Sequence, residues 1–232
     1  MCYLSSLSSY SLSHQCGIIA YKKLYFLFSQ LFHFFYFIYI FKYQRKVYNK
    51  HCAFRLFNID LPRIPELWHM VKIGLLSDTH SYLDDAVFKH FENCDEIWHA
   101  GDFGNMEVID KLAAFKPLKG VYGNIDGPEI RQIFPEHLRF NCEKVDVWMT
   151  HIGGYPGHYH PSIKREIYTK PPGLFITGHS HILKVIFDKS INCLHVNPGA
   201  AGKQGWQKVR TLVRFCISEE KIHTFDLVEM PS

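Results

Sequence analysis

Five short polar motifs constrain the fold of this 232-residue chain more than any other feature of its sequence, because each directly follows a short apolar run. Apolar runs of this length predict buried strands, so the motifs are expected where strands end. Polar side chains at the ends of neighbouring strands converge with little conformational entropy left to lose. The motifs are Asp78-Thr79-His80, Gly101-Asp102, Gly123-Asn124-Ile125-Asp126, Thr150-His151 and Gly178-His179-Ser180-His181.

From Val71 onward, the spacing of apolar residues predicts an α/β fold. The first part alternates strands and helices, and the second part contains paired strands typical of hairpins. This pattern predicts two packed mixed β-sheets with helices outside. We expect strands at 71–77, 96–100, 118–122, 138–142, 145–151, 174–177, 182–188, 192–196, 209–218 and 221–229, and helices at 83–93, 106–115 and 162–169.

The residue types in the motifs are those that bind divalent metal ions. Carboxylate, amide and imidazole groups suit Mn, Fe, Ni, Zn or Mg. Each motif alone also occurs in ordinary turns, but their joint occurrence in order favours a metal centre. Two ions about 3.5–4 Å apart need roughly seven protein ligands with one shared carboxylate. The candidate ligands are Asp78, His80, Asp102, Asn124, His151, His179 and His181.

In order and position, these motifs resemble the calcineurin-like metallophosphoesterase superfamily, in particular its small single-domain phosphodiesterase branch. The resemblance covers nearly all of residues 70–230, including the turn that begins at Asn197. It implies a four-layer αββα sandwich and hydrolysis of phosphate esters by a hydroxide that bridges two metal ions. It further assigns Asp78, His80, Asp102 and His181 to the first metal, and Asp102 as the bridge, with Asn124, His151 and His179, to the second. Manganese is the expected metal, with Ni, Fe, Zn and Mg as alternatives.

The sequence departs from the wider superfamily at one position. Many members have a His after the Asn, which assists the leaving group, whereas this chain has Ile125. The small branch generally lacks this His as well, so we expect slow hydrolysis or a preference for good leaving groups. Asp126 is expected either to orient a ligand from behind or to stabilise its turn. His158 and His160 are expected either to line the substrate pocket or to lie on a surface loop.

Residues 1–69 differ in composition from the rest of the chain. They have no acidic residue before Asp60, and they hold half of the 36 aromatic residues. The uncharged stretch 24–41 is long enough for a single membrane anchor, which would leave the following domain in the cytoplasm. The other main interpretation is an upstream extension of the reading frame that is not made in the cell, with translation starting at Met70. We therefore predict a non-domain extension at 1–69 and a metallophosphoesterase domain at 70–232.

Charge and cysteine content bear on partners and location. From Met70 onward, eighteen Lys and Arg residues stand against twenty acidic residues, so we expect no stable nucleic-acid binding. The expected partner is a small or nucleotide-like phosphate ester, and a homo-oligomer is left open. The seven cysteines are scattered without a Cys-x-x-Cys spacing, which is typical of reduced thiols and favours a cytoplasmic location.

A second class of function uses the same fold. The small retromer subunit resembles this branch but serves as a scaffold, and its site has lost part of its ligand chemistry. Here all seven candidate positions carry side chains that can bind a metal. The sequence therefore favours an enzyme over a scaffold.

Overall fold

The computed structural model of the protein describes residues 70–231. The extension at 1–69, together with its two interpretations, lies outside the described residues. The domain boundary at Met70 therefore stays a prediction. Within residues 70–231, no helix is long and apolar enough to cross a membrane.

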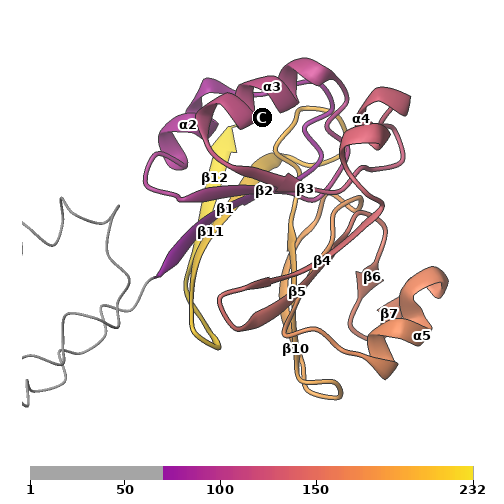
Figure 1. Ribbon diagram of the computed structural model, residues 1–232. Coiled ribbons are helices and arrows are strands. Elements are labelled where there is room, and N and C mark those ends of the chain that lie inside the picture. Colours follow the sequence, from indigo (N-terminus) through magenta and orange to yellow (C-terminus); the bar gives the residue numbers. More distant parts are fainter. Residues whose placement is uncertain (1–69, 232) are drawn as a thin grey trace, which may run out of the picture. The chain divides into compact units, whose positions relative to one another are not determined.

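Five strands form the first sheet, in the order β12-β11-β1-β2-β3. Strands β1, β2 and β3 run parallel, and β11 pairs antiparallel with both β1 and β12. Helices α2 and α3 cover the outer face of this sheet (Figure 1). The elements are β1 (Val71–Leu76), α2 (Asp85–His90), β2 (Glu96–His99), α3 (Met106–Phe115), β3 (Leu118–Gly120), α4 (Pro128–Ile133), β11 (Val209–Ser218) and β12 (Lys221–Pro231).

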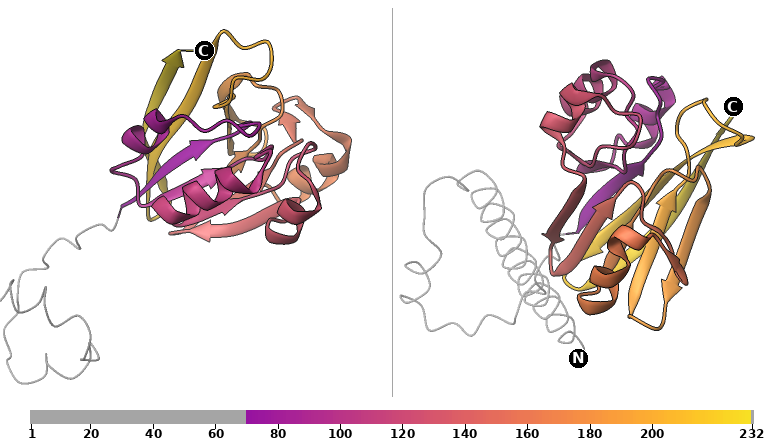
Figure 2. Two further views of the ribbon diagram at one scale, coloured as in Figure 1. Left: turned by 90° about the horizontal axis from the view of Figure 1, so that it is seen from above. Right: turned by 90° about the vertical axis from the view of Figure 1, so that its right-hand side faces the viewer.

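The second sheet also has five strands, in the order β4-β5-β8-β10-β9. Its central strands β5, β8 and β10 run parallel, while the edge strands β4 and β9 run antiparallel to their neighbours. Helix α5 packs on its outer face (Figure 2). The elements are β4 (His137–Cys142), β5 (Val145–Thr150), α5 (Pro161–Thr169), β8 (Leu174–Ile176), β9 (Leu183–Asp188) and β10 (Cys193–Pro198). A separate two-stranded sheet consists of β6 (Gly154–Tyr155) and β7 (His158–Tyr159).

The main core lies between the two sheets. Alternate residues of β1 point to opposite faces, so Ile73 and Leu75 enter this core. Trp98 of β2 crosses the interface and makes edge-on ring contacts with Phe140 and Phe215. On the other face of β1, a Cβ at Gly74 would lie 2.6 Å from the ring of Phe91, so glycine allows α2 to pack closely.

The structure confirms the predicted class, two mixed sheets flanked by helices, and it matches most predicted elements. The helix expected at 83–93 is shorter, because Asp84 caps it by accepting a hydrogen bond from the Ala86 amide and Phe91 ends it. Helix α4 and the β6–β7 hairpin were not expected. Both are too short for a hydrophobic period to form, since α4 has six residues and β6 and β7 have two each.

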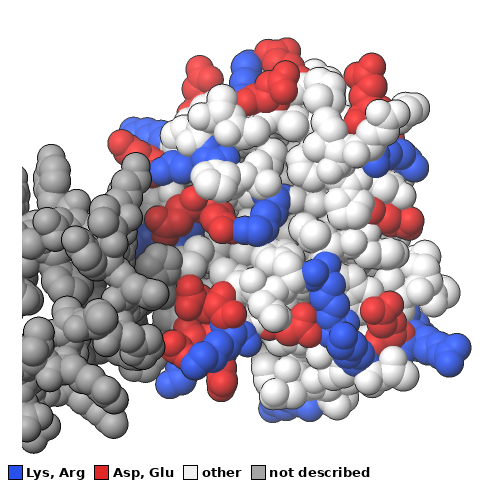
Figure 3. All heavy atoms as spheres, in the orientation of Figure 1, with Lys and Arg blue, Asp and Glu red and all other residues white. Residues whose placement is uncertain are grey.

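Basic and acidic side chains are intermixed on the face of the domain shown in Figure 3. Several oppositely charged side chains also pair directly, for example Arg139 with Asp146 and Arg210 with Asp84. Basic and acidic side chains are therefore spread over this face, and neither sign forms a separate patch on it.

Candidate metal centre

The loops that follow β1, β2, β3, β5 and β8 bring the seven candidate ligands to one place. Ligating atoms in each of two groups lie within 4.8 Å of one another. The groups are Asp78, His80 and His181, and Asp102, His151 and His179. Asn124 joins the second group, with its Oδ1 3.1 Å from Nε2 of His151.

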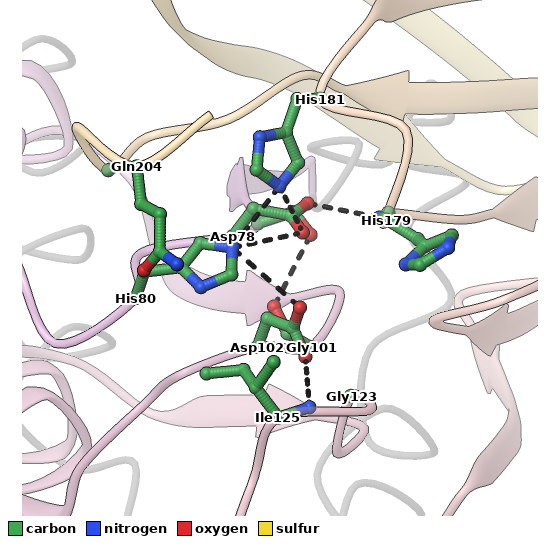
Figure 4. A network of polar contacts seen from close by, with 12 residues as sticks. Asp78, His80, Gly101, Asp102, Gly123, Ile125, His179, His181 and Gln204 are labelled. Carbon is green, nitrogen blue, oxygen red and sulfur yellow. Dashed lines mark hydrogen bonds and ion pairs between the residues drawn. The ribbon is translucent and has the colours of Figure 1, made fainter. Parts of the chain in front are cut away.

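Asp102 lies between the two groups. Its Oδ2 is 3.2 Å from Nε2 of His151 in the second group and 3.7 Å from Nε2 of His80 in the first. Its other oxygen, Oδ1, accepts a hydrogen bond of 3.1 Å from the Ile125 backbone amide (Figure 4). This contact leaves Oδ2 directed at both groups, so Asp102 has the position that a shared carboxylate needs.

The donor atoms fit divalent cations. Asp78 Oδ1 is buried without a hydrogen-bond partner, which is costly for a carboxylate oxygen. It lies 3.2 Å from Nε2 of His181 and 3.9 Å from Nε2 of both His80 and His151. The Nε2 atoms of His80 and His181 are themselves 3.2 Å apart. A cation among these atoms would satisfy all of them together.

Two of the candidate histidines are held in the tautomer that metal binding requires. Nδ1 of His151 lies 2.8 Å from the Ala100 carbonyl, and Nδ1 of His181 lies 3.0 Å from Oε1 of Gln207. Both partners can only accept, so Nδ1 carries the hydrogen in each ring and the Nε2 lone pair faces the site. Such outer partners orient a metal-binding imidazole and raise its basicity.

The electrostatics of the cluster favour positive charge. The nearby carboxylate of Asp78 raises the pKa of His181. Burial alone would lower the pKa of His151, but Asp102 and Asp78 raise it overall. In contrast, burial lowers the pKa of His80 and His179. The two carboxylates thus stabilise a cation placed among the four imidazoles.

The backbone is strained at most of the candidate ligands. Five of the seven adopt a positive φ, which is uncommon for residues other than glycine and costs up to about 1–2 kcal/mol each. Strain of this kind persists where the surrounding structure enforces it, often at functional sites. The five are Asp78 (φ 54°), His80 (46°), Asp102 (58°), His179 (67°) and His181 (55°).

Glycines in the motifs allow the loops to approach one another. A Cβ at Gly123 would lie 2.0 Å from Oδ1 of Asp102, and a Cβ at Gly101 would lie 2.6 Å from Nδ1 of His151. Either side chain would displace a candidate ligand. The glycine before Asp102 and the glycine before Asn124 therefore form part of the site geometry.

His99 connects two of the ligand-bearing loops, a role that the sequence did not indicate. It is the last residue of β2, and full burial lowers its pKa to about 3, so it is neutral. Nδ1 accepts from the Gly101 amide, and Nε2 then donates to the Thr79 hydroxyl, 3.0 Å away. That hydroxyl donates to the Phe103 carbonyl. The ring thus joins the loop of Asp78 to the loop of Asp102.

Asn197 supports the loop that carries His179 and His181. Its Nδ2 donates to the Gly178 carbonyl at 2.7 Å and to the Ser180 hydroxyl at 3.2 Å. The sequence singled out Asn197 only as part of a turn, because nothing in the chain pattern relates it to a loop nineteen residues away.

Asp126 stabilises turns and does not contact a candidate ligand side chain within the described residues. Its two carboxylate oxygens accept hydrogen bonds of 2.8 Å from the amides of Gly104 and Gly123. It therefore ties the loop after β2 to the loop after β3. Of the two expectations for Asp126, the turn-stabilising one agrees with these contacts.

His158 and His160 both line a pocket of about 530 Å³ that also includes His151 and His179. His160 has a second contact, because its Nδ1 accepts from the Ser162 amide at the start of α5. His158 lies on β7 beside the ring of Tyr155, with ring centroids 5.0 Å apart. Both histidines therefore line the same pocket as His151 and His179, two candidate ligands of the second group.

Comparisons with known proteins agree with this fold and site. The calcineurin-like phosphoesterase superfamily domain matches residues 71–220. A probable metallophosphoesterase of Methanocaldococcus jannaschii is 33% identical over 135 residues, which is 55% of this chain and 67% of that protein. A phosphodiesterase of the same organism is 25% identical over 146 residues, or 56% and 83% of the two chains. The chain therefore belongs to the calcineurin-like phosphoesterase superfamily and is a metallophosphoesterase.

Solved structures share the fold at lower identity. An archaeal phosphodiesterase superposes with a TM-score of 0.54 at 21% identity, covering 69% of this chain and all of that one. Vacuolar protein sorting 29 from Cryptosporidium parvum gives a TM-score of 0.55 at 15% identity, covering 70% and 99%. At these identities, the likeness extends to the fold and not to the activity.

Proposed function

We propose that this protein is a phosphodiesterase that hydrolyses small or nucleotide-like phosphate esters with two divalent ions, preferably manganese. The observation that carries the proposal is the position of Asp102 Oδ2, within 3.7 Å of His80 and 3.2 Å of His151. One carboxylate oxygen directed at both histidine groups is the arrangement that a pair of ions requires. The proposed ligands are Asp78, His80, Asp102, Asn124, His151, His179 and His181.

Two ions held by these ligands would activate a water molecule and neutralise charge on the phosphoryl oxygens. The protein side chains contribute positioning. Asp102 is oriented by the Ile125 amide, and His181 by Gln207. The side chain at position 125 is an exposed isoleucine that can donate no proton. Departure of a poor leaving group is therefore expected to be slow.

A scaffold of the retromer type is the alternative function. Its support is the shared fold with vacuolar protein sorting 29. Against it, all seven candidate positions carry side chains that can bind a metal.

The proposal is tested with purified, manganese-loaded protein and bis(p-nitrophenyl) phosphate. We expect turnover that a chelator abolishes and Mn²⁺ restores, and that Asp102→Ala lowers by at least about a hundredfold. Asp110→Ala, which removes an exposed carboxylate of α3, is the matched control and should keep full activity. No turnover of activated monoesters and diesters by the metal-loaded protein would favour the scaffold.

We also propose a cytoplasmic location and translation from Met70. Cys94, Cys142, Cys193 and Cys216 are free thiols, in keeping with a reducing compartment. Intact-mass measurement of the endogenous protein tests the start site, because a mass that includes residues before Met70 would contradict it.

A further inference from the structure

A groove beside the first metal group ends at an exposed tryptophan. The side chain of Trp206 is fully exposed, at 102% of its reference area, and Ile182 is 56% exposed. Both line a groove of about 420 Å³ together with His179, His181, Gly205 and Gln207. The groove thus contains two candidate metal ligands and two exposed apolar side chains.

The loop that carries Trp206 is held by side-chain contacts of the next residue, Gln207. The Gln207 side-chain amide donates to the carbonyls of Gly202 and Gln204, at 3.1 and 2.8 Å. The same side chain accepts from His181. The loop is therefore fixed on the metal group directly beside Trp206.

Gly205 allows this close approach. Its φ is +124°, and a Cβ there would lie 2.3 Å from Nδ1 of His181. Any other residue would be strained and would press on the ligand. The residue before Trp206 is thus in contact distance of the metal group, and the indole follows directly after it.

Exposure of the indole needs an explanation, because tryptophan is the side chain with the most apolar area to bury. The groove is polar at His179 and His181 and apolar at Trp206 and Ile182. No residue that lines it carries a full charge of the Lys, Arg, Asp or Glu type. Its apolar end therefore suits an uncharged flat group that is attached to a phosphate and not a second phosphate.

We propose that Trp206 stacks on the nucleobase of a nucleotide-type ester whose phosphate lies at the metal centre. The inference rests on the proposed function and narrows its substrate class. Stacking on an aromatic side chain tolerates any base, because every base has a π-face. In this arrangement Ile182 packs against the edge of the base. Because the groove has no charged side chains, it selects only weakly among the different bases.

Isothermal titration calorimetry of the Mn²⁺-loaded protein tests the proposal with two ligands, one with a nucleobase and one without. Adenosine 5′-monophosphate and ribose 5-phosphate are each titrated into the Mn²⁺-loaded protein. We expect the adenosine compound to bind at least about fivefold more tightly, in line with the typical effect of one stacked base. Trp206→Ala should abolish this difference, and Trp206→Phe should retain most of it.

The matched control is Tyr168→Ala, which removes an exposed aromatic ring of α5. It should leave the preference unchanged. Equal binding of the two ligands by the unaltered protein would overturn the inference, as would a preference that survives in Trp206→Ala. Because the Trp206 ring is exposed, Trp206→Ala and Trp206→Phe should unfold at the same temperature as the unaltered protein. Thermal unfolding of the two variants therefore checks that they are folded.

Turnover of bis(p-nitrophenyl) phosphate, measured in parallel, separates the two proposals. Turnover without base preference would overturn the Trp206 subsite alone. Tighter binding of the adenosine compound without turnover would support the Trp206 subsite and overturn the proposed phosphodiesterase activity.

Discussion

Nδ1 of His181 lies 3.0 Å from Oε1 of Gln207, and this contact joins the loop before β11 to the first metal group. The two residues are 26 positions apart in the chain. The acceptor oxygen of Gln207 fixes the hydrogen on Nδ1, so that Nε2 presents its lone pair to the site.

Loss of this acceptor should weaken metal binding. We expect Gln207→Ala to reduce Mn²⁺ affinity by about 10- to 100-fold, the usual effect of removing a hydrogen-bond partner of a metal-binding histidine. Metal titration followed by calorimetry measures the change. Lys208→Ala, at the exposed neighbouring position, is the control. Unchanged affinity in Gln207→Ala would show that His181 is oriented by other contacts.

Backbone strain at His179 can be measured directly. Its φ is 67°, and its backbone amide, which donates to Asp78, is kept in any variant. In the presence of a chelator, His179→Gly should therefore unfold at a higher urea concentration than His179→Ala, by about 1 kcal/mol in unfolding free energy. Equal stability of the two variants would argue against strain at this position.

Position 125 offers a gain-of-function test. Ile125 is 45% exposed, and its contribution to the site comes from the backbone amide, which a histidine retains. Ile125→His should raise kcat for diesters with poor alkyl leaving groups by at least about tenfold, since a placed proton donor typically contributes that much or more. Activated aryl diesters should change little. A uniform effect on both substrate types would contradict proton donation, and Ile125→Asn controls for polarity.

Stability should fall in mild acid because of the buried His195, which is not a candidate metal ligand. Burial lowers the pKa of His195 to about 4, against 6.5 in the unfolded chain. Between these values the unfolded state binds a proton that the folded state does not, so stability is complete above pH 6.5 and declines as pH falls towards 4. The full contribution of His195 to the free energy of unfolding is about 3 kcal/mol.

His195→Gln should remove this part of the pH dependence. Urea unfolding between pH 4 and 7 in the presence of a chelator measures it, because metal binding would add its own pH dependence. The variant should show a slope smaller by about one proton in this window. His223→Gln, on β12 and partly exposed, is the control. An unchanged slope in His195→Gln would assign the acid sensitivity to other groups, such as His99.

Prediction from sequence succeeded where local pattern and final structure agree. The apolar run that begins at Val71 predicts a buried strand, and this prediction does not depend on which strands it pairs with. The polar residues after β1, β2 and β3 share one sheet edge for the same reason, and those after β5 and β8 share an edge of the second sheet. This geometry brought Asp78 and Asp102 close together, with Oδ2 of Asp102 and Oδ1 of Asp78 both within 3.9 Å of His80 Nε2.

The missed features depend on chain closure. Gln207 and Asn197 act through contacts with residues 26 and 19 positions away, and no periodicity encodes such a pairing. In the sequence, His99 looks like an ordinary strand residue. Its role comes from the contacts of its ring with Thr79 and the Gly101 amide, which only the folded chain creates. Trp206 gave no signal because exposure is a property of the folded loop and not of the residue type.

The proposed ligands come from both layers of the sandwich. Asp78, Asp102 and Asn124 follow strands of the first sheet, whereas His151, His179 and His181 follow strands of the second. Metal ions bound by this set would cross-link the two sheets at one edge, whereas at the opposite edge Lys144 of the β4–β5 turn donates its backbone amide to the Glu219 carbonyl of the β11–β12 turn and pairs with its side chain. Under mechanical force, bound metals would resist separation of the two layers at their own edge, and removal of the metals would leave the Lys144–Glu219 link as the polar tie at the other edge.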